Sequence, residues 1–532
     1  MKQKQREQIV LPASRGNAST TVLDRAFARV KLGRVLAKPQ RTGSTSVTAA
    51  SARRPGPRGH KGRGLGEAQL LHPIREMRGT NYQVCGLFPF PMGGGSPLEG
   101  VPLGRNLLSG EPVCCDPISW FQKLRVIANP SAFIMANPGL GKSSLLRRMA
   151  IGLAAFGVWP MVLGDIKGEH VAMIEHLGGA VLPLGRGVGH INPLDDAGAV
   201  AAAKLLSAAK AEELLADLHT RRFDLIRSLI AILRKKPLDE REDQILDRCL
   251  TVLEARHTVS GTVPVMADLR QVLKDKPLEV REVSLDRGDD ARYREVTDRL
   301  ESSLLALTGG SELGQMFSAP TSEPIKRDRS VVFDVSSIDQ TKKEERAAAL
   351  LACWSAGFAM VNGAQLLADA GIERRRHYLA VMDELWQVLD SGPGMVERLD
   401  ALTRLNRKEG AGQVMITHTM SDLERMPHEE DRSKARGFVE RSDIVLLGGL
   451  SHQELDRVEK VLPLSRKERE RIVSWTSPGS YDAKTRKRTN PPGMGHFLMK
   501  MSGRPGIAGR VELTSTEKRL QLHNTSRRWI EG

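Results

Sequence analysis

The 532-residue sequence predicts an α/β fold in which a mostly parallel sheet carries helices on both faces. Three observations lead to this fold class. Short apolar runs alternate with segments of helical periodicity, a glycine-rich turn joins one such run to a helix, and two carboxylates follow another run. A long helical block interrupts the alternation, so we expect one sheet that begins before the block and is completed after it.

The first 66 residues are expected to form a disordered basic arm. They contain fifteen Lys or Arg and two acidic residues, a net charge of +13 out of +16 for the whole chain. Because they are rich in Arg, Ser, Gly and Ala, they cannot bury enough apolar surface to fold alone. The arm is either a solvated tail or a contact for nucleic acid or anionic lipid. The rest of the chain carries only +3, which gives little electrostatic reason for tight DNA binding.

The remaining chain divides into five further units by composition and periodicity. They are a small β-rich lead-in (67–130), the first part of the core (131–195), an all-helical insertion (196–325), the second part of the core (326–500) and a C-terminal segment (501–532).

Apolar runs predict the strands of the core. Before the insertion they are Ala132–Met135 and Trp159–Leu163, and after it Ser330–Val335, Tyr378–Met382, Val414–Thr417 and Ile444–Leu447. Helices are expected at Ser143–Ala155 and Glu344–Leu367, and a helix of the insertion is expected to start near Pro264.

No segment is expected to cross a membrane. The longest apolar candidates, Met149–Gly164 and Ala347–Met360, are interrupted by Pro160 or too short for the roughly 20 residues a spanning helix needs. The five cysteines show no C-x-x-C pair, and no secretory signal pattern is present, which indicates reduced cytosolic thiols. We therefore expect a cytoplasmic protein, with peripheral association at the inner face of the cell membrane left open.

A phosphate-binding loop is predicted between the first strand and the first helix of the core. Small residues there let successive backbone N–H groups curl around a phosphate, and the following helix adds its positive N-terminal end. Lys142 would reach the β- and γ-phosphates, and the Ser143 hydroxyl would ligate Mg²⁺. The nucleotide-binding residues are Ala136, Asn137, Pro138, Gly139, Leu140, Gly141, Lys142, Ser143 and Ser144. Ala136 departs from the usual first glycine, but this residue ends the strand and needs no positive φ.

Two carboxylates, Asp383 and Glu384, follow the strand Tyr378–Met382. Asp383 can hold Mg²⁺ through a water ligand, and Glu384 can orient and polarise the attacking water. The sequence contains no Asn-Lys-x-Asp guanine-reading motif, which favours ATP over GTP. The residues therefore predict an ATPase that uses ATP and Mg²⁺.

The chain resembles the TraC-type ATPases of conjugative type IV secretion systems, within the FtsK and HerA motor superfamily, whose core is a RecA-like P-loop NTPase. The resemblance runs from about Pro97 to the C-terminus. Besides the phosphate loop and Met382–Trp386, the segments that carry it are Gly164–Glu169, Gly178–Gly179, His190–Asp195, Ser330–Val335, Arg404–Gly410 and Met415–His418.

The resemblance implies a hexameric ring with ATP between subunits, and contacts with secretion channel proteins. It also implies that a cation from the neighbouring subunit stabilises the transferring phosphoryl group, with Arg404 and Arg407 as the candidates. His418 stands where the family usually has a glutamine that senses the γ-phosphate. The family usually has a sizeable N-terminal domain that contacts the channel. This chain has only the arm and lead-in, which leaves open a docking partner different from that of the family.

Three functions are compatible with the sequence. The first is an ATPase that powers transfer of DNA or protein through a conjugation-type apparatus. The second is a DNA translocase or coupling ATPase of the FtsK and HerA type, which would be stimulated by double-stranded DNA. The third is an ATP-binding assembly scaffold with little turnover, supported only by the unusual His418.

Overall fold

A computed structural model describes residues 95–523, except 340, 390–395, 397–409, 427–428, 483–486 and 502. The basic arm at 1–66 therefore lies outside the described residues, as do Arg404 and Arg407. Among the described residues, eleven strands form one sheet in the order β2-β1-β13-β12-β9-β3-β8-β7-β4-β6-β5. The strands β10 and β11 form a separate two-stranded hairpin.

Seven neighbouring strands of the large sheet are parallel. In sheet order they are β9 (Ile444–Leu447), β3 (Ser131–Met135), β8 (Ala411–Thr417), β7 (His377–Met382), β4 (Val158–Asp165), β6 (Val331–Asp334) and β5 (Ala180–Pro183). Each strand expected from an apolar run is present within a few residues of its expected bounds. The edge strand β5 was not expected.

Four antiparallel strands extend the sheet beyond β9. They are β12 (His496–Met501), β13 (Ile507–Val511), β1 (Pro102–Asn106) and β2 (Pro112–Cys114), and the separate hairpin consists of β10 (Tyr481–Asp482) and β11 (Lys487–Arg488). The lead-in and the C-terminal segment thus contribute strands to the same sheet as the core. Gly104 allows the close pairing of β1 with β13, because a Cβ there would lie 1.8 Å from the Arg510 carbonyl oxygen.

Side chains alternate between two apolar layers, as strand geometry requires. Ala132 and Ile134 of β3 pack in the layer formed with α4, whereas Phe133 and Met135 pack in the layer that contains α13. Helices of the first layer include α4 (Lys142–Ala155) and α5 (Val171–His176); those of the second include α13 (Lys343–Asp369), α16 (Met420–Leu423), α17 (Glu429–Glu440) and α18 (His452–Val458). The predicted mostly parallel α/β architecture is therefore present.

Shorter helices complete the described core. They are α3 (Pro117–Ser119), the π-helical turn η2 (Trp120–Leu124), α14 (Trp386–Leu389), α19 (Arg466–Ser474) and α20 (Ser515–Arg519).

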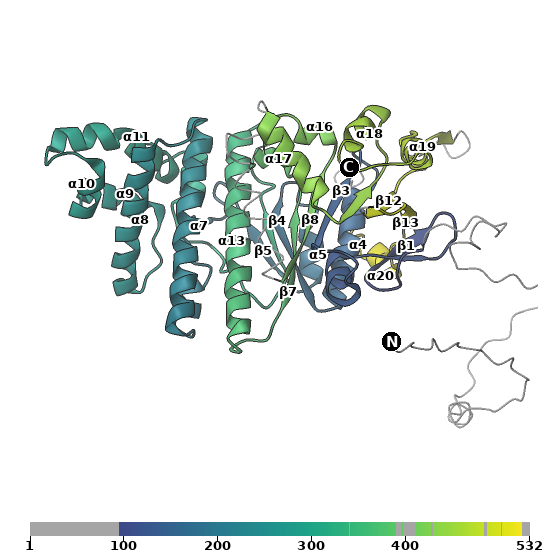
Figure 1. Ribbon diagram of the computed structural model, residues 1–532, viewed down its shortest axis with the longest axis horizontal. Helices are drawn as coiled ribbons and strands as arrows, with labels where there is room; N and C mark the ends of the chain where they lie inside the picture. The colour runs from purple at the N-terminus through teal and green to yellow at the C-terminus, as the bar shows by residue number, and fades with distance from the viewer. Residues whose placement is uncertain are drawn as a thin grey trace, which may run out of the picture. The chain divides into compact units, whose positions relative to one another are not determined.

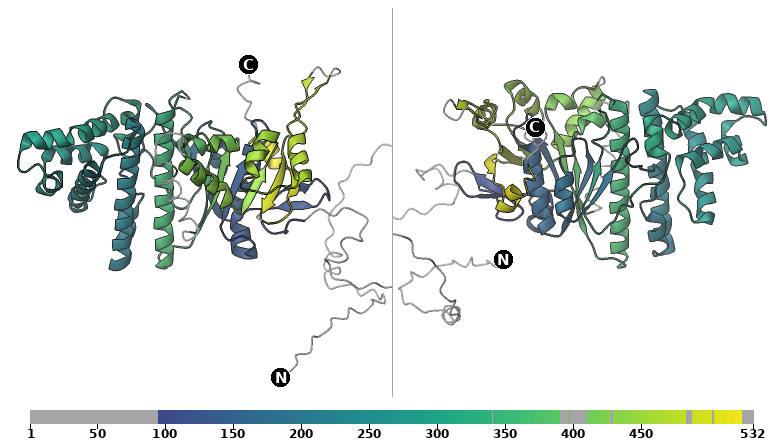
Figure 2. Two further views of the ribbon diagram at one scale, coloured as in Figure 1. Left: turned by 45° about the horizontal axis from the view of Figure 1, so that its top comes forward. Right: turned by 180° about the vertical axis from the view of Figure 1, so that it is seen from behind.

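The segment between β5 and β6 is helical, as expected for the insertion. Its helices are α6 (Ala199–Ala203), α7 (Ala208–Arg234), α8 (Glu240–Ser260), α9 (Met266–Asp275), α10 (Leu278–Ser284), α11 (Asp290–Thr308) and α12 (Glu312–Phe317). The long helix α13 packs against α7 on one side and β4 on the other (Figure 1). The two turned views keep α7 and α13 side by side (Figure 2).

Within the described residues, α13 is the one helix long and apolar enough to cross a membrane by length and composition. Its most apolar window is 89% buried against the rest of the fold. The apolar side chains of α13 therefore have protein neighbours on nearly all sides.

Candidate functional site

The predicted phosphate loop connects β3 to α4. Gly139 and Gly141 have φ angles of 78° and 99°, a left-handed region that glycine adopts without strain. A Cβ at Gly141 would also lie 3.2 Å from the Gly495 nitrogen, so no side chain fits comfortably there. Helix α4 begins at Lys142, which places Ser143 and Ser144 in its first turn. The loop has the strand–turn–helix setting that phosphate binding requires.

Ala136, the departure from the usual pattern, is accommodated by a glycine opposite. It is not among the described non-glycine residues with positive φ, in agreement with the expectation. A Cβ built at Gly448, which follows β9, would lie 2.5 Å from the Ala136 Cβ. Next to it, the Asn137 N–H donates to the Gly449 carbonyl at 3.0 Å. The absence of a side chain at Gly448 therefore makes room for the extra methyl group of Ala136.

Lys142 extends from the start of α4 toward the carboxyl ends of the strands. Its ammonium donates to the Ala136 carbonyl at 3.0 Å and contacts Nδ1 of His418. Burial lowers the pKa of Lys142 to about 8, although the nearby charges of Glu384 and Asp383 favour its protonated form. The lysine therefore faces both members of the predicted acidic pair.

The acidic pair follows the buried strand β7, which pairs with β8, which in turn pairs with β3. Glu384 has a φ of 52°, a left-handed conformation that is strained for a residue with a side chain. Its own N–H donates to Oδ1 of Asp383 at 2.9 Å. The parallel order thus brings the acidic pair, the phosphate loop and His418 together at the carboxyl ends of three neighbouring strands, β7, β3 and β8.

Three side chains hold the Glu384 carboxylate. Oε1 accepts from Lys167 Nζ at 2.9 Å and from His418 Nε2 at 2.9 Å, and Oε2 accepts from Trp386 Nε1 at 2.7 Å. Burial would raise the pKa of Glu384, but the His418 hydrogen bond and the Lys167 charge outweigh it and lower the pKa far below its usual range. Glu384 is thus a fixed carboxylate anion.

His418 bridges the two halves of the site. Since the Lys142 ammonium can only donate, His418 Nδ1 must accept from it, and the Nε2–H then donates to Glu384. This arrangement places the donating N–H of the ring on Nε2. A glutamine, with one amide oxygen and one NH₂ group, has the same pair of functions. The position predicted for the γ-phosphate sensor therefore lies between the phosphate loop and the predicted base.

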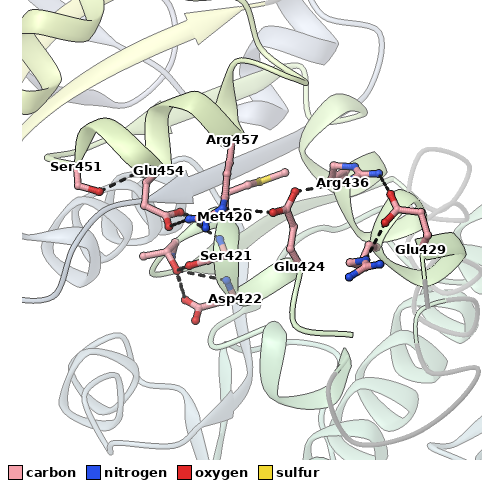
Figure 3. Close-up of polar contacts among 11 residues, drawn as sticks. Met420, Ser421, Asp422, Glu424, Glu429, Arg436, Ser451, Glu454 and Arg457 are labelled. Carbon is pink, nitrogen blue, oxygen red and sulfur yellow. Dashed lines mark hydrogen bonds and ion pairs between the residues drawn. The ribbon is translucent and has the colours of Figure 1, made fainter. Parts of the chain in front are cut away.

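A polar network holds the segment that follows His418 (Figure 3). Oε2 of Glu454 in α18 accepts from the N–H groups of Met420 and Ser421 at 2.8 and 3.1 Å, at the start of α16. Arg457 and Arg436 both contact Glu424, which joins α18 and α17 to the end of α16. Helices α17 and α18 thus hold α16, which begins two residues after His418.

The loop after β4, part of the Gly164–Glu169 motif, contributes residues for which no role was predicted. Asp165 accepts from the N–H groups of Glu169 and His170 at 3.0 and 2.6 Å. His170 is fully buried with Nε2 at 3.6 Å from Oδ2 of Asp383, and neither ring nitrogen has a hydrogen-bond partner among the described residues. Sequence reasoning assigned no role to Lys167, His170 or Trp386. The position of the Gly164–Glu169 motif at the end of a core strand was the available signal for Lys167.

Hydroxyl and carboxylate oxygens, as supplied by Ser143 and Asp383, are the ligand types that Mg²⁺ prefers. The residues present therefore fit Mg-ATP. Arg404 and Arg407, predicted to act in the neighbouring subunit, are not among the described residues.

Neither protein-family models nor curated proteins match the sequence. Among solved structures, VirB4 of Thermoanaerobacter pseudethanolicus superposes with a TM-score of 0.56 and 19% identity, over 80% of this chain and 100% of VirB4. The chain shares its fold with VirB4. This likeness confirms the predicted fold class. Because the sequence identity is low, the comparison shows a shared fold alone.

Two further structures are less similar. The plasmid coupling protein TrwB in complex with ADP and Mg²⁺ has a TM-score of 0.44 and 14% identity over 72% of this chain and 85% of TrwB. The cytoplasmic domain of the Thermomonospora curvata type VII secretion ATPase EccC has a TM-score of 0.31 and 14% identity over 80% of this chain and 30% of EccC.

Proposed function

We propose that this chain is an ATP-hydrolysing motor that energises DNA or protein transfer through a conjugation-type (type IV) secretion apparatus. The observation that carries the proposal is the meeting of Lys142, His418 and Glu384 at one edge of a sheet whose fold is shared with VirB4. The sequence motifs that resemble the TraC-type ATPases support the same function.

In the proposed reaction, the phosphate loop binds the β- and γ-phosphates, and the Lys142 charge stabilises the negative charge that develops during transfer. Ser143 and Asp383 would hold Mg²⁺, which supplies further charge neutralisation when bound. Glu384 orients the attacking water and draws its proton. His418 senses the γ-phosphate, because one ring nitrogen contacts Lys142 and the other hydrogen-bonds to Glu384.

The proposed working form is a homo-oligomer, most simply a hexamer, at the inner face of the cell membrane and in contact with channel proteins. The arginines Arg404 and Arg407 are the proposed source of the cation that acts across the subunit boundary. The resemblance to the TraC-type family supports these assignments.

The function is tested by measuring ATP turnover of the purified full chain as a function of protein concentration. We expect Lys142→Ala and Glu384→Gln to lower kcat by at least about 100-fold, because each removes a group that acts on the transferring phosphate or water. Glu512→Gln is the matched control, since Glu512 forms an exposed ion pair with Arg105 and should retain wild-type turnover.

The outcomes separate the alternatives. Normal hydrolysis by Glu384→Gln would show that Glu384 is not the base. Stimulation by double-stranded DNA that grows with DNA length would favour a translocase. ATP binding with background turnover in the assembled oligomer would favour the scaffold.

A further inference from the structure

Lys167 is the one described ammonium group that forms an ion pair with the predicted base. It lies in the loop between β4 and α5, and its Nζ is 2.9 Å from Glu384 Oε1. The proposed reaction assigns it no role. Its position next to the base raises the question of what it does when nucleotide arrives.

The two partners of this ion pair differ in freedom. The Glu384 side chain is 6% exposed, and Trp386 and His418 hold it as well. The Lys167 side chain is 45% exposed on a flexible four-carbon stem. The ammonium group can therefore leave while the carboxylate stays in place.

A continuous chain of contacts leads from the phosphate loop to Lys167. Lys142 contacts His418, His418 donates to Glu384, and Glu384 accepts from Lys167. A γ-phosphate held by Lys142 would bring new negative charge into this small space. Burial is the main cause that lowers the pKa of Lys142. The charge of Lys167 also lowers it, because the two ammonium groups are close enough to repel each other. A bound phosphate would attract both.

We propose that Lys167 pairs with Glu384 in the nucleotide-free chain and exchanges this carboxylate for the γ-phosphate of ATP. The inference rests on the proposed ATPase function. A carboxylate has about four acceptor positions, two on each oxygen; Lys167 and His418 fill both of those on Oε1, and Trp386 fills one on Oε2. Departure of Lys167 opens a position on Oε1 for the attacking water. Lys167 thus links the presence of the γ-phosphate to the availability of the base.

The test compares the affinities of Mg-ADP and a Mg-bound ATP analogue with a non-hydrolysable β–γ bond, measured at equilibrium. We expect Lys167→Met to weaken binding of the analogue about tenfold or more, because a charge-assisted contact to phosphate is lost. ADP affinity should stay within about twofold, since ADP lacks the γ-phosphate. Lys167→Arg should restore much of the preference, and Lys123→Met, which removes an exposed ammonium paired with Glu99, is the matched control.

The same substitution is then made together with Glu384→Gln. If Lys167 contacts the γ-phosphate, Lys167→Met weakens analogue binding at least as strongly in the Glu384→Gln chain, where no carboxylate competes for the ammonium group, as in the wild type. If Lys167 only neutralises Glu384, the effect disappears in that chain, and the proposal is overturned. An equal loss of ADP and analogue affinity would also overturn it.

The two proposals fail in different ways. A wild-type chain that neither binds nor hydrolyses ATP would refute the proposed function, and this inference with it. A wild-type chain that hydrolyses ATP, with an unchanged nucleotide preference in Lys167→Met, would refute the inference alone.

Discussion

The methyl group of Ala136 occupies space that a side chain at Gly448 would need. We predict that Gly448→Ala destabilises the protein by about 1–3 kcal/mol, because the added Cβ would lie 2.5 Å from the Ala136 Cβ and must displace the phosphate loop. The measurement is the free energy of unfolding in urea. Gly310→Ala is the matched control, since a Cβ there has no neighbour within 4 Å, and equal stability of both variants would contradict the prediction.

His418 uses both ring nitrogens, one as acceptor and one as donor. We predict that His418→Gln keeps kcat within about fivefold of wild type, because the amide supplies the same acceptor and donor. His418→Leu should lower kcat by roughly 10- to 100-fold, since it removes both hydrogen bonds. Steady-state ATP turnover tests this, and wild-type turnover by the leucine variant would show that the bridge has no part in hydrolysis.

At the residue scale, sequence motifs identified groups whose chemistry is local. The phosphate loop depends on consecutive residues, so Gly139, Gly141 and Lys142 could be found from spacing alone. The Lys167 partner of Glu384 could not, because Lys167 follows β4 and meets Glu384 only through the order of strands in the sheet. The left-handed conformation of Glu384 likewise depends on its surroundings in the fold, so the residue sequence did not predict it.

Helices α7 and α8 of the insertion are joined by a charged cluster around His219. The imidazole lies 2.7 Å from Glu254 and 3.0 Å from Asp247. The hydrogen bond with Glu254 is the main cause that raises the pKa of His219 from 6.5 to about 9. Because the folded state binds this proton more tightly, the cluster contributes its full stability below about pH 6.5 and loses it as the pH rises to about 9.

We therefore predict that the unfolding free energy of the wild type falls by roughly 1–2 kcal/mol more between pH 6.5 and 9 than that of His219→Gln. The measurement is urea unfolding of both chains across this range. Parallel curves would show that His219 is not more basic in the folded state.

At the element scale, the strands found from sequence are those with continuous buried apolar runs, such as Ile444–Leu447. The missed strands lack this signal. Strand β12 contains Lys500, whose ammonium is buried in an ion pair with Glu468 at 3.0 Å, so its run does not read as apolar. Strand β5 has four residues and is the outermost strand of the sheet. Most of its side chains are partly exposed, so its sequence does not need a strong apolar pattern.

The charge distribution of the whole molecule makes a prediction about DNA. Because residues 1–66 carry +13 of the net charge of +16, we expect salt-dependent DNA affinity to be lost when they are removed. ATP turnover and DNA binding of the full chain and of the chain lacking residues 1–66 test this, each at low and high salt. Unchanged DNA affinity after removal would place the contact in the body of the protein.

The segment that contains β12 and β13 is synthesised long after the phosphate loop that it contacts. The Gly495 N–H donates to the Leu140 carbonyl at 3.0 Å, and the Val511 N–H donates to the Gly495 carbonyl at 2.8 Å. The phosphate loop therefore receives part of its support from residues translated more than 350 positions later. We therefore expect the predicted phosphate loop of a nascent chain to lack this support until Gly495 and Val511 have been synthesised.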